Sequence, residues 1–212
     1  MNKNIEEQKY WNRHDVWGNG GHDWSLKFGN TENLWNELLR DDVKQYCNGN
    51  GIEIAPGHGR ITDFLLKECN SLSVVDLNAY PISECVKRFG SRINGYYVND
   101  GKSLSMFNAS CYDFVFSFDS FVHMHFDVVK SYLLEMKRVL KNEGIVFIHH
   151  SNLTGGEEES FHNIAGRANL NVDILNTFMY SIGYQLMSQN YVNISAEFTD
   201  LHDIITIAKI NK

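Results

Sequence analysis

The chain has 212 residues, which is enough for one well-filled α/β domain and too few for two comfortable ones. Its 19 basic and 26 acidic residues give a net charge of −7, so we expect no phosphate-binding surface of duplex size and no nucleic-acid substrate. No apolar run is long enough to span a membrane, and the polar start at Met1–Glu7 lacks the apolar core of a signal peptide.

The first fifty residues differ from the rest because they contain all four tryptophans. Large indole rings are typical of a packing cap, since each buries much area. The glycines between them also suit the hinges of a lid that excludes water from a reaction site. Both interpretations stay open. Asn30 or Thr31 is expected to cap a helix that runs to about Cys47.

Strands and helices alternate after this segment, which predicts right-handed crossovers and a mostly parallel sheet with helices on both faces. The last two strands have no helical pattern between them, so we expect a hairpin and one antiparallel strand. Ligands then bind at the carboxyl ends of the strands. The expected strands end at Glu53, Asp76, Val98, Ser117, His149, Leu186 and Ala208, and the expected helices include Pro81–Phe89, Val128–Leu140 and Val172–Ile182.

The stretch Gly51–Arg60 predicts a buried strand, a tight glycine turn and a helix start. Asp76 ends the next strand, where a carboxylate accepts hydrogen bonds from two ribose hydroxyls. A dinucleotide site would have a third glycine where Thr62 stands, and the carboxylate of Glu53 disfavours a nearby phosphate. These residues therefore favour a nucleoside-containing cofactor with a cationic centre.

The pattern Glu53-x-Ala55-x-Gly57-x-Gly59, with Asp76 downstream, resembles the S-adenosylmethionine site of class I methyltransferases. The resemblance departs at Ala55, where glycine is usual, and at Pro56. Alanine is acceptable there only with a negative φ. The resemblance implies S-adenosyl-L-methionine as cofactor, S-adenosyl-L-homocysteine as product, and a Rossmann-like fold. The cofactor-binding residues that it implies are Glu53, Ala55, Gly57, Gly59, Asp76, Leu77, Asn99, Asp100 and Phe118.

Two histidine-bearing stretches follow adjacent strands, namely 117–125 and 149–152. A hydroxyl acceptor benefits from a base, and histidine has a suitable pKa. His123, His149, His150 and Asp119 are therefore the candidate catalytic residues, and His123 is expected to open the next helix. Alternation along the strand turns either His149 or His150 into the core, and His150 is preferred for the cleft. Asp119 is expected to orient a histidine or bind substrate hydroxyls.

A metal ion is the competing explanation for Asp119 and these histidines, since the set suits zinc, iron or manganese. The further carboxylates of metal-dependent sugar O-methyltransferases are absent near these strands, so a divalent metal is not favoured. The candidate substrate-binding residues are His22, Trp24, Ser151, Asn152 and Arg167, with Asn163 as a further polar group. Arginine pairs well with phosphate, although a solvated position at a helix start is the preferred interpretation of Arg167.

The stretches 116–123 and 147–152 are similar to small bacterial methyltransferases found with surface-polysaccharide and natural-product genes. This implies O-methylation of a sugar or nucleotide-linked sugar, with an N-methyltransferase or a phosphate-directed variant as the alternative. A non-catalytic cofactor-binding module is a remote alternative. We expect a single domain over 1–212, with a cap or lid at 1–48 and a cofactor-binding core at 49–212.

The four cysteines are scattered without CxxC spacing, which predicts reduced thiols in a cytoplasmic protein. The expected partner is a small-molecule substrate rather than a nucleic acid or a membrane, and a homo-oligomer is compatible with the sequence.

Overall fold

The computed structural model describes residues 9–153, 166–194 and 203–212. The chain divides into two compact units, Met1–Gly101 and Lys102–Lys212. The structure does not test the prediction of a single domain, which stays a prediction. Among the described residues, no helix is both long enough and apolar enough to cross a lipid bilayer.

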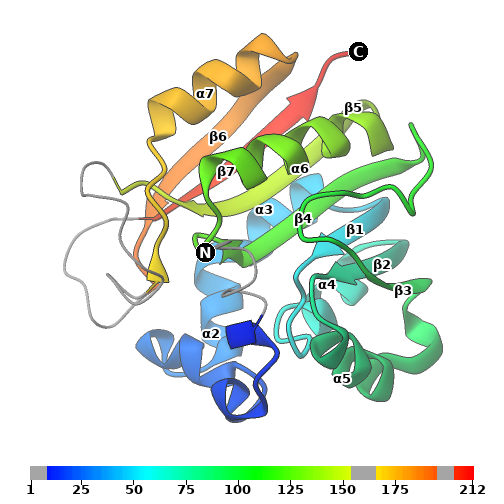
Figure 1. Ribbon diagram of the computed structural model, residues 1–212, viewed down its shortest axis with the longest axis vertical. Coiled ribbons are helices and arrows are strands. Elements are labelled where there is room, and N and C mark those ends of the chain that lie inside the picture. Colours follow the sequence, from blue (N-terminus) through cyan, green and yellow to red (C-terminus); the bar gives the residue numbers. More distant parts are fainter. Residues whose placement is uncertain (1–8, 154–165, 195–202) are drawn as a thin grey trace. The chain divides into compact units, whose positions relative to one another are not determined.

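The first unit contains a parallel sheet in the order β3-β2-β1, with α5 against β2 and β3 and α4 against β2 (Figure 1). Its strands have buried apolar side chains such as Ile52, Leu72 and Val74. The bounds of its main elements are η1 His14–Trp17, η2 His22–Phe28, α2 Thr31–Leu34, η3 Trp35–Leu39, α3 Arg40–Tyr46, β1 Asn50–Ile54, α4 Thr62–Glu68, β2 Ser71–Asp76, α5 Ala79–Phe89, η4 Gly90–Arg92 and β3 Gly95–Val98.

The expected helix before the first strand is confirmed in a modified form. The side chain of Asn30 accepts a hydrogen bond from the N–H of Asn33, as a helix cap does. The helical segment that follows contains a π-helical turn, η3, between α2 and α3. Its buried face includes Leu34, Trp35 and Val43, so the periodic apolar residues do pack against the core.

The second unit contains a mixed sheet in the order β4-β5-β7-β6. β4 and β5 are parallel, whereas β7 is antiparallel to both β5 and β6, which confirms the expected antiparallel strand. α6 and α7 contact each other and lie over the same face of this sheet (Figure 1). The element bounds are β4 Tyr112–Phe121, α6 Phe126–Val139, β5 Leu140–Ser151, α7 Val172–Ser181, β6 Tyr184–Val192 and β7 Asp203–Ile210.

Three boundaries differ from the sequence-based expectations. β4 continues past Ser117 to Phe121, with a register shift against β5 between these two residues. α6 begins at Phe126 after His125, so the prediction that His123 opens this helix was wrong. β5 begins at Leu140, which was expected to end the preceding helix, and Glu143 within this strand has a φ of 61°.

Candidate functional site

The turn after β1 has a left-handed backbone at three positions. Ala55, Gly57 and Gly59 have φ angles of 55°, 58° and 80°. The expectation of a negative φ for Ala55 was therefore wrong, because the turn keeps a glycine-like conformation in spite of the alanine Cβ. A Cβ on Gly59 would lie 2.2 Å from a ring carbon of Phe89, so only glycine fits this close approach.

Asp76 ends β2 with its side chain buried beside the glycine turn. Its Oδ1 accepts a hydrogen bond of 2.9 Å from the N–H of Asn78, and the N–H groups of Gly57 and Leu77 also interact with the carboxyl group. Burial raises the pKa of Asp76 to about 7 against the effect of these N–H groups. A ligand that donates further hydrogen bonds would favour the ionised form.

Glu53, on the neighbouring strand β1, is a second buried carboxyl group. The hydroxyl of Thr62, the first residue of α4, donates a hydrogen bond of 2.7 Å to its Oε2. Burial raises the pKa of Glu53 to about 7, although the Thr62 hydroxyl opposes this shift. Thr62, which stands where a dinucleotide site would have glycine, is thus a hydrogen-bond partner of Glu53.

The remaining candidates in this unit lie around the end of β3. The N–H of Asn99 donates to the backbone oxygen of Asp76 at 2.9 Å, and the Asn99 side chain accepts from the N–H of Gly101 at 3.0 Å. Leu77 packs toward Gly101, whereas Asp100 is exposed. The structure therefore brings Asn99 and Leu77 next to Asp76.

The N-terminal segment packs on the glycine turn. The Trp17 indole is buried and stacks on the imidazole of His58 with 4.5 Å between ring centroids, and a Cβ on Gly57 would lie 2.6 Å from the Trp17 ring. Among the described groups, Nε2 of His58 is buried without a hydrogen-bond partner. Trp17 therefore packs on the glycine turn, which is compatible with both the cap and the lid interpretation.

The two substrate-binding candidates of this segment are held by neighbouring side chains. Nδ1 of His22 lies 2.7 Å from the Thr31 hydroxyl, and burial lowers the pKa of His22. The Trp24 ring packs against Trp17 and lies under the guanidinium group of Arg60, at 5.6 Å from its centre. Both side chains are thus part of the packing of the N-terminal segment.

In the second unit, His149 lies fully buried between two groups of the protein. Its Nδ1 accepts a hydrogen bond of 3.1 Å from the N–H of Asp119. The proton of the neutral ring is therefore on Nε2, and the carboxylate of Asp203 lies 3.6 Å from this nitrogen. The ring of Phe118 stacks on the imidazole at 4.7 Å.

His150 points to other partners, as alternation along β5 requires. Its Nδ1 lies 2.8 Å from the carbonyl oxygen of Ser151, and its Nε2 lies 2.7 Å from the hydroxyl of Thr206. Burial lowers the pKa of His150 to about 4. With both ring nitrogens bonded inside the protein, this residue has the properties of a buried structural histidine.

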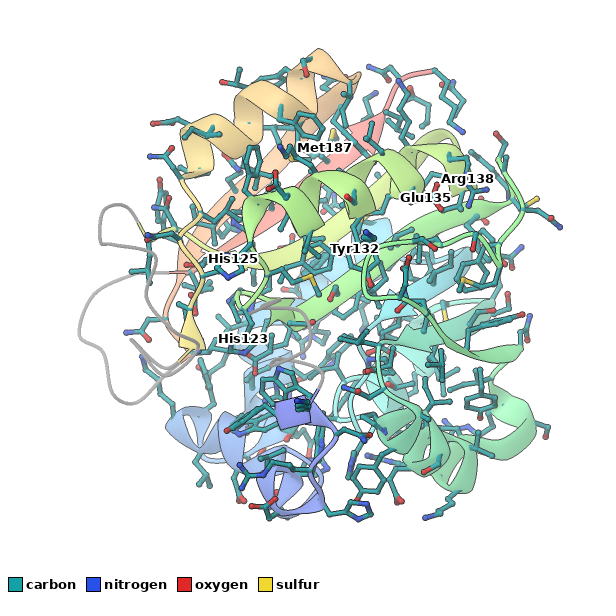
Figure 2. All side chains as sticks on the ribbon, viewed as in Figure 1. His123, His125, Tyr132, Glu135, Arg138 and Met187 are labelled. Atoms are coloured by element: carbon teal, nitrogen blue, oxygen red, sulfur yellow. The ribbon has the colours of Figure 1, made fainter. Side chains whose placement is uncertain are left out.

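His123 lies on the turn that leads into α6, and His125 lies at the start of this helix (Figure 2). Nδ1 of His123 lies 2.8 Å from the carbonyl oxygen of Gly166, so this nitrogen carries the proton and Nε2 of the neutral ring does not. Burial lowers the pKa of His123, and the charge of Arg167 acts in the same direction. The ring is therefore held in the form that accepts a proton.

The other substrate-binding candidates are mostly engaged with the protein. The Ser151 hydroxyl accepts from the N–H of Leu153 at 3.2 Å, and the Asn152 side chain accepts from the N–H of Val172 at 3.1 Å. Asn163 lies outside the described residues. The expectation of a solvated Arg167 was wrong, because its side chain is 7% exposed and forms an ion pair of 2.8 Å with Asp203.

Asp119, His149, Arg167 and Asp203 form a cluster in the second unit. Asp203 is its one member that the sequence did not suggest. It is the first residue of a strand that continues with Ile204 and Ile205. An aspartate at the start of such an apolar strand could have indicated this pairing, because a charged side chain that is buried with the strand needs a partner of opposite charge. Among the described residues there is no group of three or more metal-ligating side chains.

Comparisons with known proteins add a family and a fold. Residues 52–148, a little less than half of the chain, match the family model described as a methyltransferase domain. This segment includes Glu53, the glycine turn and Asp76, and it ends just before His149. No curated protein has a sequence that matches the chain significantly.

Solved structures match over much more of the chain. A complex of DhpI with SAH has a TM-score of 0.70 and 14% identity, over 100% of this chain and 98% of that one. A putative methyltransferase in complex with the Trm112 methyltransferase activator of Haloferax volcanii has a TM-score of 0.68 and 14% identity, over 93% and 97% of the two chains. A Burkholderia thailandensis 1,6-didemethyltoxoflavin-N1-methyltransferase, with bound S-adenosylhomocysteine, has a TM-score of 0.62 and 16% identity, over 85% and 82%. At these identities the similarity establishes the fold.

Taken together, the match of residues 52–148 to a methyltransferase domain agrees with the resemblance to class I methyltransferases, and the solved structures confirm the Rossmann-like architecture.

Proposed function

From the premise that residues 52–148 form an S-adenosylmethionine-dependent methyltransferase domain, we propose that the chain methylates a hydroxyl group of a small polar acceptor. The proposed acceptor is a sugar or nucleotide-linked sugar of surface-polysaccharide or natural-product biosynthesis. A histidine removes the hydroxyl proton, and we assign this role to His123.

The residues of the first unit fit an adenosyl sulfonium compound. Asp76 offers a buried carboxylate for two ribose hydroxyls, and Glu53 offers a second one for the cationic amino-acid end. Gly57 and Gly59 supply the left-handed turn between them. The cofactor supplies a methyl group that is already activated by the positive sulfur, so the protein mainly has to align the acceptor and manage one proton.

The observation that carries the choice of His123 is its tautomer. The carbonyl oxygen of Gly166 accepts the Nδ1 proton, so Nε2 holds a lone pair. His149 uses Nδ1 as an acceptor and keeps its proton on Nε2, and His150 has both nitrogens bonded. Transfer of the methyl group to the acceptor oxygen would break the sulfur–methyl bond of the bound cofactor and leave S-adenosylhomocysteine, while Nε2 of His123 takes the hydroxyl proton.

Methylation of nitrogen is the second candidate, because one protein with this fold is an N1-methyltransferase by its name. An amine brings its own lone pair and needs less help from a base. A phosphate-directed reaction is less favoured, since the guanidinium group of Arg167 is already paired with Asp203. A module that binds the cofactor without catalysis is the remote alternative.

The acceptor is tested with the purified chain, S-adenosylmethionine and a panel of free sugars, nucleotide-linked sugars and matched amino sugars. Release of S-adenosylhomocysteine identifies the substrates, and NMR of the product locates the methyl group. We expect methyl ethers. Methylation on nitrogen alone would reject the proposed acceptor chemistry.

The base is tested by the pH dependence of kcat at saturating cofactor for His123→Gln, with His125→Gln as the matched control. We expect wild type to lose activity in acid, with a midpoint below the ordinary histidine pKa, because the pKa of His123 is lowered. His123→Gln should lose this limb and most of its activity, about 100-fold or more. An unchanged acid limb in His123→Gln would remove His123 from the mechanism.

A further inference from the structure

We propose that Asp203 and Arg167 are positioning residues of the acceptor site, and that they act through His149 on the strand bulge that presents Asp119 to the acceptor hydroxyl. This inference rests on the proposed function. It concerns contacts within the second unit alone.

The starting point is a buried ion pair between residues far apart in the sequence. Arg167 donates from Nε to Oδ1 of Asp203 at 3.2 Å and from Nη2 to Oδ2 at 2.8 Å. The two side chains are 7% and 3% exposed. Although burial alone would raise it, the neighbouring His149 and Arg167 hold the pKa of Asp203 well below its usual range. Buried pairs of this kind are weak contributors to stability, so a positional role is a better reason for this one.

The ion pair continues into the imidazole of His149. Oδ2 of Asp203 is 3.6 Å from Nε2 of His149, the nitrogen that carries the proton. This nitrogen has no hydrogen-bond partner among the described groups, so the carboxylate is its electrostatic partner. The opposite nitrogen, Nδ1, accepts the N–H of Asp119. His149 thus links Asp203 to the backbone of Asp119.

Asp119 needs such support because its backbone is strained. Its φ is 62°, in the left-handed region that residues with a side chain disfavour. It lies where the register between β4 and β5 shifts, between Ser117 and Phe121. Bulges of this kind re-aim side chains near active sites. The bulge and the hydrogen bond to His149 together hold the backbone from which the Asp119 side chain extends.

The cluster also includes the proposed base. The pKa of His123 responds to the charges of Arg167, Asp119 and Asp203, so these groups lie within electrostatic reach of its ring. A carboxylate that orients the acceptor hydroxyl and an imidazole that takes its proton are complementary roles. We therefore assign substrate contact to Asp119 and His123, and positioning to His149, Asp203 and Arg167.

Two variants of the full chain test this inference. Asp203→Asn keeps the shape of the side chain but leaves the buried guanidinium group without its counter-charge, so it is expected to fold poorly. Arg167→Met combined with Asp203→Leu removes both charges, and such replacements of buried pairs are often neutral for stability. The matched control is Glu135→Gln, which weakens a different ion pair of the same unit, on α6.

For the double variant we expect kcat/KM for the acceptor to fall by about 100-fold, because Asp119 would no longer be held in the position from which it contacts the acceptor. The Kd for S-adenosylhomocysteine should stay within about twofold, and the N–H of Asp119 should exchange with solvent about tenfold faster. Glu135→Gln should leave kcat/KM and this exchange rate unchanged. Unchanged acceptor kinetics in a folded double variant would overturn the inference.

The exchange measurement separates this inference from the proposed function. If wild type methylates no hydroxyl acceptor, the proposed function fails, but the N–H of Asp119 still reports whether Asp203 and Arg167 hold the bulge. An exchange rate that the double variant does not alter would reject the positioning role by itself.

Discussion

Ala55 has a side chain where the backbone conformation favours glycine, with a φ of 55°. Its N–H donates a hydrogen bond of 2.7 Å to the carbonyl oxygen of Val75, which keeps the turn attached to β2. The sheet contact therefore maintains a conformation that the alanine itself disfavours. This strain is local and can be relieved without changing any contact.

We expect Ala55→Gly to raise the free energy of unfolding by up to about 1 kcal/mol, since the relieved strain exceeds the added flexibility of glycine. Urea denaturation measures the change. Ala79→Gly is the control, because Ala79 is the first residue of α5 and has no positive φ. This variant should lower the free energy of unfolding slightly. Equal losses in both variants would contradict the interpretation of Ala55.

The glycine turn and the buried position of Asp76 could be predicted from the sequence because both are close in sequence to the strand ends that carry them. In the second unit the sequence offered Asp119, His149 and Arg167 as candidates, but the pairing of the last two with Asp203 could not be predicted. Asp203 and Arg167 are 36 residues apart, and their pairing with His149 depends on the antiparallel register of β5 and β7. Nor does alternation alone reveal which of His149 and His150 has both nitrogens bonded.

At the level of elements, helices and strands were predictable where the apolar periodicity was clear, as in α5 and α7. The bulge in β4 was not, because nothing in the letters Phe118-Asp119-Ser120 distinguishes a bulge from a strand end. The start of β5 at Leu140, directly after α6, was also missed. Asn142-Glu143-Gly144 has the composition of a turn, and it lies in an irregular part of β5 between Leu140, which pairs with Tyr112, and Ile145, where regular pairing begins.

Two charged side chains of α6, Glu135 and Arg138, bond to the segment before β4 (Figure 2). Glu135 accepts the N–H of Leu104 at 2.9 Å, and Arg138 donates to the carbonyl oxygens of Leu104 and Phe107, each at 2.9 Å. The two side chains also pair with each other at 2.9 Å. The hydrogen bond from Arg138 lowers the pKa of Glu135.

We expect Arg138→Met to lower the free energy of unfolding by about 2 kcal/mol, because it removes the hydrogen bonds of Arg138 to the carbonyl oxygens of Leu104 and Phe107 and its ion pair with Glu135. Urea denaturation measures this loss, and hydrogen exchange at Leu104 should accelerate. The control is Lys87→Met, which breaks the exposed pair with Glu84 and should change stability by less than about 0.5 kcal/mol. Similar effects of the two variants would show that the contacts to Leu104 and Phe107 contribute little.

For the molecule as a whole, the net charge of −7 does not reveal that two carboxyl groups of the first unit titrate near neutrality. Glu53 and Asp76 have pKa values of about 7 in the folded chain, above their ordinary values of 4.5 and 3.8. At pH values between the ordinary and the raised pKa of each group, the folded state binds a proton that the unfolded state does not. Each group therefore lowers stability as pH rises toward 7, by at most about 1.4 kcal/mol per pH unit.

His150 acts in the opposite direction, because its pKa is lowered to about 4. Below the ordinary histidine pKa of 6.5 the unfolded state binds the extra proton, so this residue lets stability rise with pH between about 4 and 6.5. The two effects partly cancel in wild type. Variants of the carboxyl groups are therefore needed to separate them.

In the proposed cofactor site the ionised form of Asp76 would accept the ribose hydroxyls, so cofactor affinity should depend on pH with the opposite sign to the stability contributed by this group. We expect the Kd of S-adenosylhomocysteine to rise at least about tenfold from pH 8 to pH 6, since the ionised fraction of Asp76 falls by that factor around a pKa of about 7 and Glu53 acts in the same direction. Asp76→Asn should bind more weakly and lose the part of this pH dependence that Asp76 contributes. Asp113→Asn is the control, because it removes an equal charge from a surface pair with Lys141. Calorimetric titration at the two pH values measures all three proteins, and a Kd that does not change with pH in wild type would place Asp76 outside the cofactor site.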